Sequence, residues 1–173
     1  MLASELAGIE LIGSDGPEPV EDGATFAANA LIKARAAAAA TGLPAVADDS
    51  GICVDALGGA PGIHSARYAG SRVDADNVAR LLAELGDAAE RTAQFVCAAA
   101  LVDGEFEHVE VASWPGSVLR EPAGSGGFGY DPIFRPDGFE VSAAQLSADE
   151  KNAISHRHLA FSALAPVVRA RLL

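Results

Sequence analysis

The spacing of apolar and polar residues along this chain predicts three helical segments. Residues 25–40 begin at a threonine that can cap a helix and stop shortly before a glycine, which is common just past a helix end. Residues 74–85 place valine and leucine side chains on one face. From Ser147, which opens the S-x-x-E pattern of a capping box, helical sequence is expected to run to the C-terminus, with Pro166 able to break or restart it.

Short apolar runs between the helical segments predict strands. "LPAVA", residues 43–47, predicts a buried strand that ends at Asp48 and Asp49. Residues 1–13 are expected to hold the tail of a helix and then a short strand, because leucine and isoleucine recur among them.

A hairpin is expected in the middle of the chain. Asp103-Gly104 is a two-residue turn signal between the apolar residues 92–102 and the alternating residues 105–112. Strands, helices and a hairpin together indicate a mixed α/β domain.

Composition narrows the class of protein. The 173 residues are half hydrophobic, which argues against disorder, and charges interrupt the apolar runs well short of the ~20 residues that span a membrane. The N-terminus lacks the basic start of an export signal. The formal net charge of −12 disfavours sequence-independent binding to nucleic acid. Cys53 and Cys97 are too few for a disulfide scaffold, so we expect two buried thiols in the reducing cytoplasm.

The glycine-rich stretch "GSGGFGYDP", residues 124–132, fits the dinucleotide-binding pattern G-x-G-x-x-G. That pattern must follow a strand, open a helix and meet an acidic residue about 20 positions later. Here a Tyr-Asp-Pro follows at once, and Pro132 disfavours helix at the residue before it. We therefore expect a loop that wraps a flat ligand, not a dinucleotide fingerprint.

Two adjacent carboxylates, Asp48 and Asp49, follow the strand expected at residues 43–47. Carboxylates at the end of a buried strand are costly unless they bind a cation or hydrogen-bond donors, and strand ends in α/β sheets commonly carry ligands. Glu21 lies upstream, beside the start of the helix that carries Lys33. All-oxygen ligands suit Mg²⁺ or Mn²⁺. A turn with aspartate capping is the alternative for this Asp-Asp-Ser-Gly segment.

Five segments resemble, in order, motifs of the inosine triphosphate pyrophosphatase family: "GATFAANALIKA", "LPAVADDSGICVDALGGAPGIHSARYAG", "SWPG", "EPAGSGGFGYDPIF" and "LSADEKNAISHR". They span most of residues 21–157. The resemblance implies a single catalytic domain over residues 1–173, an α/β fold with a mixed twisted β-sheet flanked by helices, and two lobes with the active-site cleft between them. It also implies hydrolysis of dITP, ITP and XTP to the monophosphate and pyrophosphate, a Mg²⁺ or Mn²⁺ cofactor, and a homodimer.

The resemblance further implies a role for each matching residue. Asp49 takes the position of the catalytic base and of a metal ligand, and Glu21 that of the metal-binding glutamate. Asp48 takes the position of a supporting carboxylate at the same metal. The residues that match substrate contacts are Ser50, Lys33, Lys151, Phe128, Gly129, Tyr130, Asp131, His156 and Arg157.

These residue types suit the reaction. A triphosphate carries about four negative charges, so cations must offset them before water attacks the α-phosphorus. Phe128 offers a face on which a base can stack. His156 and Arg157 can donate hydrogen bonds to the 6-oxo group that hypoxanthine and xanthine have and adenine lacks. Each of these residues also has a structural alternative when it is considered alone. Phe128 could be a core residue, and the His156-Arg157 pair could lie at the solvated edge of a helix. The order of the five motifs along the chain favours the functional interpretation.

The sequence departs from the family at its start. The family begins with a strand and a loop of the form [ST]-x-N-x-x-K, and no such segment is present here, so we expect a misassigned start or an omitted segment. If the protein genuinely lacks this loop, the alternative is a nucleotide-binding protein that does not hydrolyse its ligand. A second alternative keeps hydrolysis but shifts the substrate to pyrimidine or modified nucleotides, as in the septum-formation inhibitor-like pyrophosphatases. Phe128 and the His156-Arg157 pair favour purine.

Overall fold

The computed structural model describes residue 6 and residues 8–173, which divide into two compact units. The first unit consists of Met1–Asp49, Cys97–Ala112 and His156–Leu173. The second unit consists of Ser50–Val96 and Ser113–Ser155. The prediction that residues 1–173 form a single catalytic domain with a cleft between two lobes stays a prediction.

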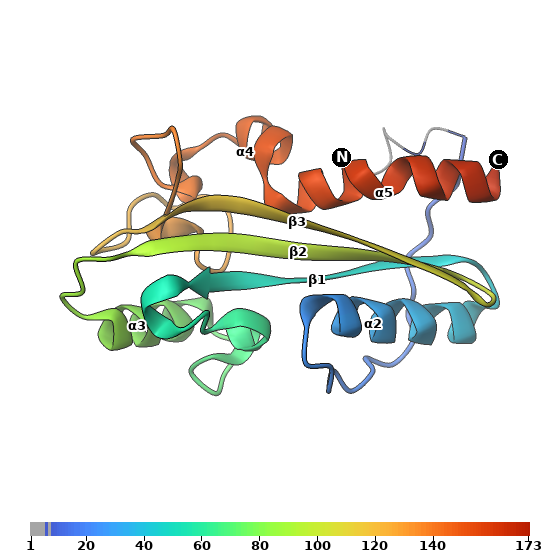
Figure 1. Cartoon of the computed structure of the whole chain (residues 1–173), viewed down its shortest axis with the longest axis horizontal. Helices are drawn as coiled ribbons and strands as arrows, with labels where there is room; N and C mark the ends of the chain where they lie inside the picture. Colours follow the sequence, from blue (N-terminus) through green and yellow to red (C-terminus); the bar gives the residue numbers. More distant parts are fainter. Residues whose placement is uncertain (1–5, 7) are drawn as a thin grey trace. The chain divides into compact units, whose positions relative to one another are not determined.

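The described strands form one sheet in the order β1-β2-β3-β4. They are β1 (Ala45–Val54), β2 (Thr92–Asp103), β3 (Phe106–Val118) and β4 (Phe134–Pro136). Figure 1 shows the arrows of β1 and β2 pointing in opposite directions, and β3 pairs antiparallel with β4. The hairpin between β2 and β3 turns at residues 104–105, one residue later than expected, because Asp103 still belongs to β2 and Gly104 takes the positive φ of 61°.

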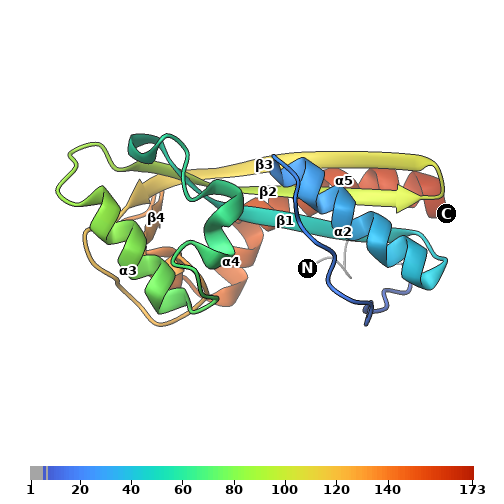
Figure 2. The same ribbon diagram turned by 90° about the horizontal axis from the view of Figure 1, so that it is seen from below.

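Two helices cover opposite faces of the strands in the first unit: α2 (Phe26–Thr41) on one and α5 (His156–Leu172) on the other (Figures 1 and 2). Successive strand residues point to opposite faces, so β2 supplies apolar side chains to both helices. Those that pack with α5 are Cys97, Ala99 and Leu101, and those that pack with α2 are Ala98, Ala100 and Val102. This two-sided burial confirms the predicted α/β class with helices flanking a sheet.

Local capping sets both ends of α2 as the sequence predicts. The Thr25 side chain accepts a hydrogen bond from the Ala28 N–H at 3.1 Å, and Gly42 closes α2 with φ 68°. In the C-terminal region the helical sequence is interrupted at Ser155, between α4 (Ala148–Ile154) and α5. Pro166 lies inside α5 and does not break it.

The second unit buries an aromatic cluster beneath α3 (Asp74–Leu85) and several short 3₁₀ helices. The ring centroids of Phe95 and Phe134 lie 4.6 Å apart, and those of Trp114 and Phe134 lie 5.4 Å apart, both edge to face. Leu81 of α3 is fully buried in the same core cluster. The 3₁₀ helices are η1 (Asp55–Leu57), η2 (Gly62–Arg67), η3 (Asp131–Ile133) and η4 (Ala143–Gln145).

Two strand predictions are wrong. The first strand does not end at Asp48 and Asp49 but continues to Val54, because Ile52 and Val54 are fully buried and extend the apolar pattern beyond the two carboxylates. Residues 8–15 form no strand. The helix tail expected in the same region falls mainly on residues 1–5 and 7, which lie outside the described residues.

Candidate active site

The longer β1 decides how the predicted carboxylates are arranged. Neighbouring residues of a strand point to opposite faces, so Asp48 and Asp49 cannot project to the same side. Asp49 faces α2, where it contacts Asn29 and Lys33. Asp48 faces α5, where it contacts Arg157. The structure therefore brings Asp49 together with the α2 residues and keeps Asp48 apart from them.

Glu21 and Asp49 come from separate segments and meet at one cation. The Lys33 Nζ lies 3.2 Å from Glu21 Oε2 and 2.8 Å from Asp49 Oδ1. Burial of Lys33 opposes its charge, but the hydrogen bonds and the attraction from Asp49 and then from Glu21 outweigh burial, so the pKa of Lys33 is raised above its ordinary value of 10.5. Lys33 therefore carries its positive charge throughout the neutral pH range, and both carboxylates face a fixed cation.

Asn29 also contacts this group of charged side chains, although it is not among the site residues predicted from the sequence. Its side chain is buried and its Nδ2 donates a hydrogen bond to Asp49 Oδ2 at 3.3 Å. The signal was present in the sequence, because Asn29 and Lys33 are four residues apart and so share one face of α2. The two residues hold one oxygen each of the Asp49 carboxylate.

Asp48 has its own partners on the α5 side of the sheet. The Arg157 Nε donates to Asp48 Oδ2 at 2.9 Å, and Cys97 Sγ lies 3.6 Å from the same oxygen. Burial of Cys97, and then the negative charge of Asp48, raise the pKa of the Cys97 thiol far above its ordinary value, so it stays protonated and can donate to the carboxylate. His156 precedes Arg157 at the start of α5 and is buried.

The predicted base-binding loop belongs to the second unit, and Phe128 is its exposed side chain. The Phe128 ring is 60% exposed, and the Lys151 Nζ lies 4.5 Å from its centroid, in a cation–π contact. Two carboxylates hold the adjoining peptide N–H groups: Asp131 accepts from Phe128 at 2.9 Å and Asp74 accepts from Gly129 at 2.7 Å. Because carboxylates occupy these N–H groups, the loop does not offer them to a phosphate as a dinucleotide-binding loop does.

Tyr130 and Asp131 lie beneath this loop instead of lining its surface. Asp131 is 2% exposed and is paired with Lys151, and Tyr130 is 5% exposed and donates its hydroxyl to the Ser65 carbonyl at 2.7 Å. Burial raises the pKa of Tyr130, so its hydroxyl remains protonated. These two residues support the loop, and Phe128 and the partly exposed Gly129 are the ones that a ligand can reach.

The space beside Asp131 also explains a glycine in the loop. A Cβ at Gly127, which has φ 69°, would collide with the Asp131 carboxylate. The glycine therefore allows Asp131 to close against the backbone and hold the Phe128 N–H. Ser50, the remaining predicted contact, is half-buried on β1 directly after Asp49.

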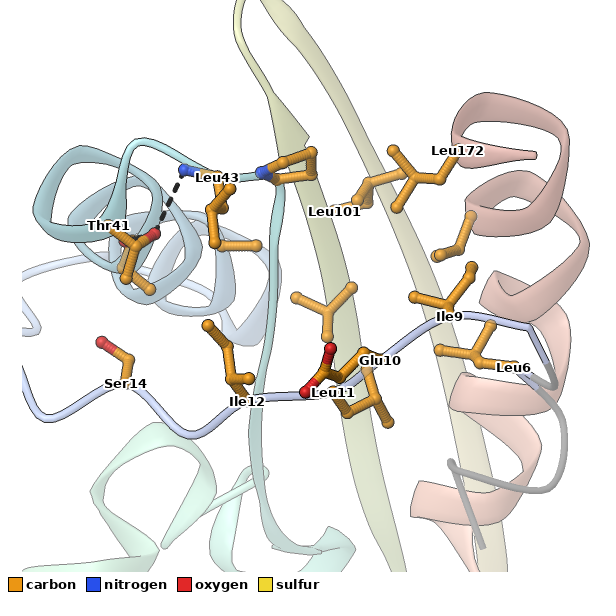
Figure 3. A pocket seen from close by; sticks show the side chains of 15 residues that line it. Leu6, Ile9, Glu10, Leu11, Ile12, Ser14, Thr41, Leu43, Leu101 and Leu172 are labelled. Atoms are coloured by element: carbon orange, nitrogen blue, oxygen red, sulfur yellow. Dashed lines mark hydrogen bonds between the residues drawn. The ribbon is translucent and has the colours of Figure 1, made fainter.

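A cavity of about 440 Å³ lies elsewhere in the first unit (Figure 3). Its walls are mainly apolar, and Figure 3 shows Ile9, Leu11 and Ile12 of the N-terminal segment facing Leu43 and Leu101 across it. None of the predicted site residues lines this cavity. An apolar space without cationic groups does not suit a triphosphate. The predicted site residues instead form two groups, one around Asp49 in the first unit and one around Phe128 in the second.

Residues 6 and 8–173 contain no cluster of three or more His, Cys, Asp or Glu side chains arranged to hold a metal ion. No helix among them is both long and apolar enough to cross a membrane. Cys97 is buried as expected, whereas Cys53 is only half-buried, and both thiols are free.

The fold and these two groups define an α/β protein with convergent acidic side chains and a separate aromatic loop. The Ham1 family model matches residues 1–167, and the chain belongs to this family. The "dITP/XTP pyrophosphatase" of Leifsonia xyli subsp. xyli is 56% identical over 174 residues, which cover 98% of this chain and 87% of the relative. The protein of the same name from Streptomyces coelicolor is 55% identical, and the match covers 94% of this chain and 86% of that protein.

Solved structures give the same result. A HAM1 protein from Coxiella burnetii has a TM-score of 0.89 and 41% identity, and the match covers 98% of this chain and 91% of that one. A structure described as nucleoside-triphosphatase / dITP/XTP pyrophosphatase, from Mycobacterium abscessus, has a TM-score of 0.78 and 50% identity, with 96% and 89% covered. The family resemblance found in the sequence is thus confirmed.

Proposed function

We propose that this chain hydrolyses non-standard purine nucleoside triphosphates, dITP, ITP and XTP, to the monophosphate and pyrophosphate. It is a nucleoside triphosphate pyrophosphatase, a hydrolase of the Ham1 family, whose relatives carry the name dITP/XTP pyrophosphatase. The observation that carries the chemistry is the convergence of Glu21 and Asp49 on one cation, Lys33 Nζ.

The donor set of this site fits a hard divalent cation. Mg²⁺ in phosphate-transferring sites is usually bound by one or two carboxylates together with the phosphates of the substrate, so a complete protein cage is not required. Glu21 and Asp49 supply two such carboxylates, and the ammonium group between them occupies a position suited to positive charge. When bound, Mg²⁺, or Mn²⁺ in its place, offsets the negative charge of the triphosphate. The metal-binding role predicted for Asp48 stays a prediction, because its partner in the structure is Arg157.

Asp49 acts as the general base in this proposal. Its carboxylate is held by donors on both oxygens, Asn29 and Lys33, and is therefore oriented before a water molecule gives up its proton. Lys33 and Lys151 supply positive charge for the phosphates, and Ser50 follows Asp49 as a hydroxyl donor. Attack of the water at the α-phosphorus breaks the bond to the bridging oxygen, and pyrophosphate leaves.

Recognition of the base depends on Phe128, Gly129, His156 and Arg157. The exposed Phe128 ring stacks with the purine, and Gly129 lets the backbone approach it closely. His156 and Arg157 donate to the 6-oxo group, and Tyr130 and Asp131 act by holding the loop. An adenine would leave these donors facing an amino group, which costs about 1–3 kcal/mol for each unpaired donor.

The remaining expectations are a homodimer in the cytoplasm, without nucleic acid or membrane partners. A reducing cytoplasm agrees with the two free thiols. An intact-protein mass measurement under native conditions tests the homodimer.

The decisive experiment measures pyrophosphate release from dITP, XTP and dATP by the full chain with Mg²⁺. We expect turnover of dITP and XTP with little turnover of dATP. Binding of dITP without release of pyrophosphate would support the alternative of a non-hydrolysing nucleotide-binding protein. Preferential turnover of pyrimidine triphosphates would support the alternative substrate class.

A further inference from the structure

Asn29 forms a bridge between two parts of the first unit that are far apart in the sequence. Its Oδ1 accepts a hydrogen bond from the Gly23 N–H at 2.9 Å, and its Nδ2 donates to Asp49 Oδ2 at 3.3 Å. Gly23 lies two residues after Glu21, so one amide side chain links the Glu21 segment to β1. The side chain is 2% exposed, and water therefore cannot easily replace either hydrogen bond.

The chemistry of the two partners dictates which way the amide points. A carboxylate only accepts hydrogen bonds, and a peptide N–H only donates. The amide group of Asn29 matches both, with its nitrogen toward Asp49 and its oxygen toward Gly23. Neither an aliphatic nor a charged side chain of similar size satisfies the two partners at once.

The contact also explains why position 23 is a glycine. A Cβ on Gly23 would lie 2.5 Å from Asn29 Oδ1 and 2.8 Å from the Ala28 Cβ, and both distances are too short. The φ of Gly23 is not in the left-handed region, so space rather than backbone conformation excludes a side chain here. Gly23 and Asn29 therefore form a fitted pair at the start of α2.

We propose that Asn29 is a positioning residue that sets the spacing between Glu21 and Asp49, and that divalent-cation binding by these two carboxylates depends on it. The inference rests on the proposed function, because it takes Glu21 and Asp49 as the metal-binding pair. Asn29 itself does not contact the metal. It acts by fixing the Glu21 segment through Gly23 and by orienting Asp49. Loss of a residue that holds a metal ligand typically lowers metal affinity about 10- to 100-fold.

The test measures Mn²⁺ binding to the full chain in the absence of nucleotide, with free Mn²⁺ followed by electron paramagnetic resonance. The variants are Asn29→Ala, Gly23→Ala and the double variant. Asn77→Ala is the matched control, because Asn77 is also 2% exposed and its amide also joins separate backbone groups. Its Oδ1 accepts a hydrogen bond from the Ala69 N–H, and its Nδ2 donates to the carbonyls of Ala66 and Ser71. Thermal unfolding of every variant shows which proteins are folded.

We expect Asn29→Ala to weaken Mn²⁺ binding about tenfold and Asn77→Ala to leave it unchanged. Gly23→Ala should produce a loss in the same direction, and it carries the test if Asn29→Ala does not fold. The double variant should lose less than the product of the two single effects, because both changes break the same contact. The Mg²⁺ concentration that half-saturates dITP hydrolysis should rise in parallel.

Equal Mn²⁺ affinity in the wild type, Asn29→Ala and Gly23→Ala would overturn the inference, and so would an equal loss in Asn77→Ala. Failure of the proposed function is a separate result: the wild-type chain binds Mn²⁺ but releases no pyrophosphate from dITP. In that case, a selective loss of Mn²⁺ binding in Asn29→Ala still supports the positioning role.

Discussion

Asp48 and Asp49 are adjacent in sequence but face opposite sides of β1, and each meets a different cation. Asp49 Oδ1 lies 2.8 Å from Lys33 Nζ of α2, and Asp48 Oδ2 lies 2.9 Å from Arg157 Nε of α5. The alternation of a strand separates the two carboxylates, so they should differ in function. Asp49 shares its cation with Glu21, and Asp48 orients an arginine expected to contact the base.

The first prediction compares the two aspartates. Asp49→Asn should reduce pyrophosphate release from dITP about 10²–10⁴-fold, because the amide cannot accept a proton from water. Asp48→Asn keeps a side-chain oxygen that can accept a hydrogen bond from Arg157, so it should reduce turnover much less. Because its contact with Arg157 is weaker, it should reduce the discrimination between dITP and dATP. Steady-state kinetics of both variants check this, and equal losses of kcat would contradict the division of roles.

The second prediction concerns pH and Lys33. Because the pKa of Lys33 is raised in the folded state, its ion pairs contribute fully to stability below the unfolded value of 10.5. That contribution is lost as pH rises through the higher pKa of the folded protein. The free energy of unfolding should therefore fall more steeply above pH 10.5 in the wild type than in Lys33→Met. Urea unfolding at a series of pH values measures the difference, and identical slopes would exclude it.

The third prediction concerns Phe128. Since the ring is 60% exposed, Phe128→Ala should leave thermal stability nearly unchanged. It should raise KM for dITP about 5- to 150-fold, which corresponds to the ~1–3 kcal/mol of one base-stacking contact. Phe128→Trp, which keeps an aromatic face, should restore most of the affinity. A KM unaffected by Phe128→Ala would show that the ring does not hold the base.

The fourth prediction concerns the buried pair beneath the loop. Asp131 is 2% exposed and pairs with Lys151, so removing one partner leaves an uncompensated charge and should cost about 3–5 kcal/mol. Asp131→Ala should show this loss in urea unfolding. The double variant Asp131→Ala with Lys151→Met should recover part of it. A double variant that loses the sum of both single effects would show that the two side chains are not coupled.

The fifth prediction concerns the two thiols. Burial raises the pKa of both Cys97 and Cys53, but Cys97 is fully buried while Cys53 is half-buried. Because thiolate is the reactive form, Cys97 in the folded protein should resist a thiol reagent at pH 8 much longer than Cys53. Mass spectrometry of the labelled protein at successive times checks the order, and urea should abolish the difference.

The helix ends were predictable because their causes are local. Thr25 and Gly42 bound α2, and the Ser147–Glu150 capping box opens α4, as the sequence indicates. Each of these contacts joins residues within four positions of each other, so neighbouring letters contain all the required information. The family motifs likewise led to Asp49, Lys33 and Phe128.

The partners of those residues could not be predicted in the same way. Gly129 and Asp74 are 55 residues apart, and Arg157 and Asp48 are 109 residues apart, yet each pair is hydrogen-bonded. The predicted end of the first strand was wrong for a related reason: burial of Ile52 and Val54 in the core extends β1 past its two carboxylates.

The sequence by itself therefore determined the α/β class, the helix ends and the family, because local capping, apolar spacing and ordered motifs encode them. Only the tertiary structure decided that Asp48 points away from the Glu21 and Asp49 carboxylates and pairs with Arg157. The face to which a strand residue points depends on which strands and helices bury its neighbours, and that is settled by packing between segments far apart in the chain.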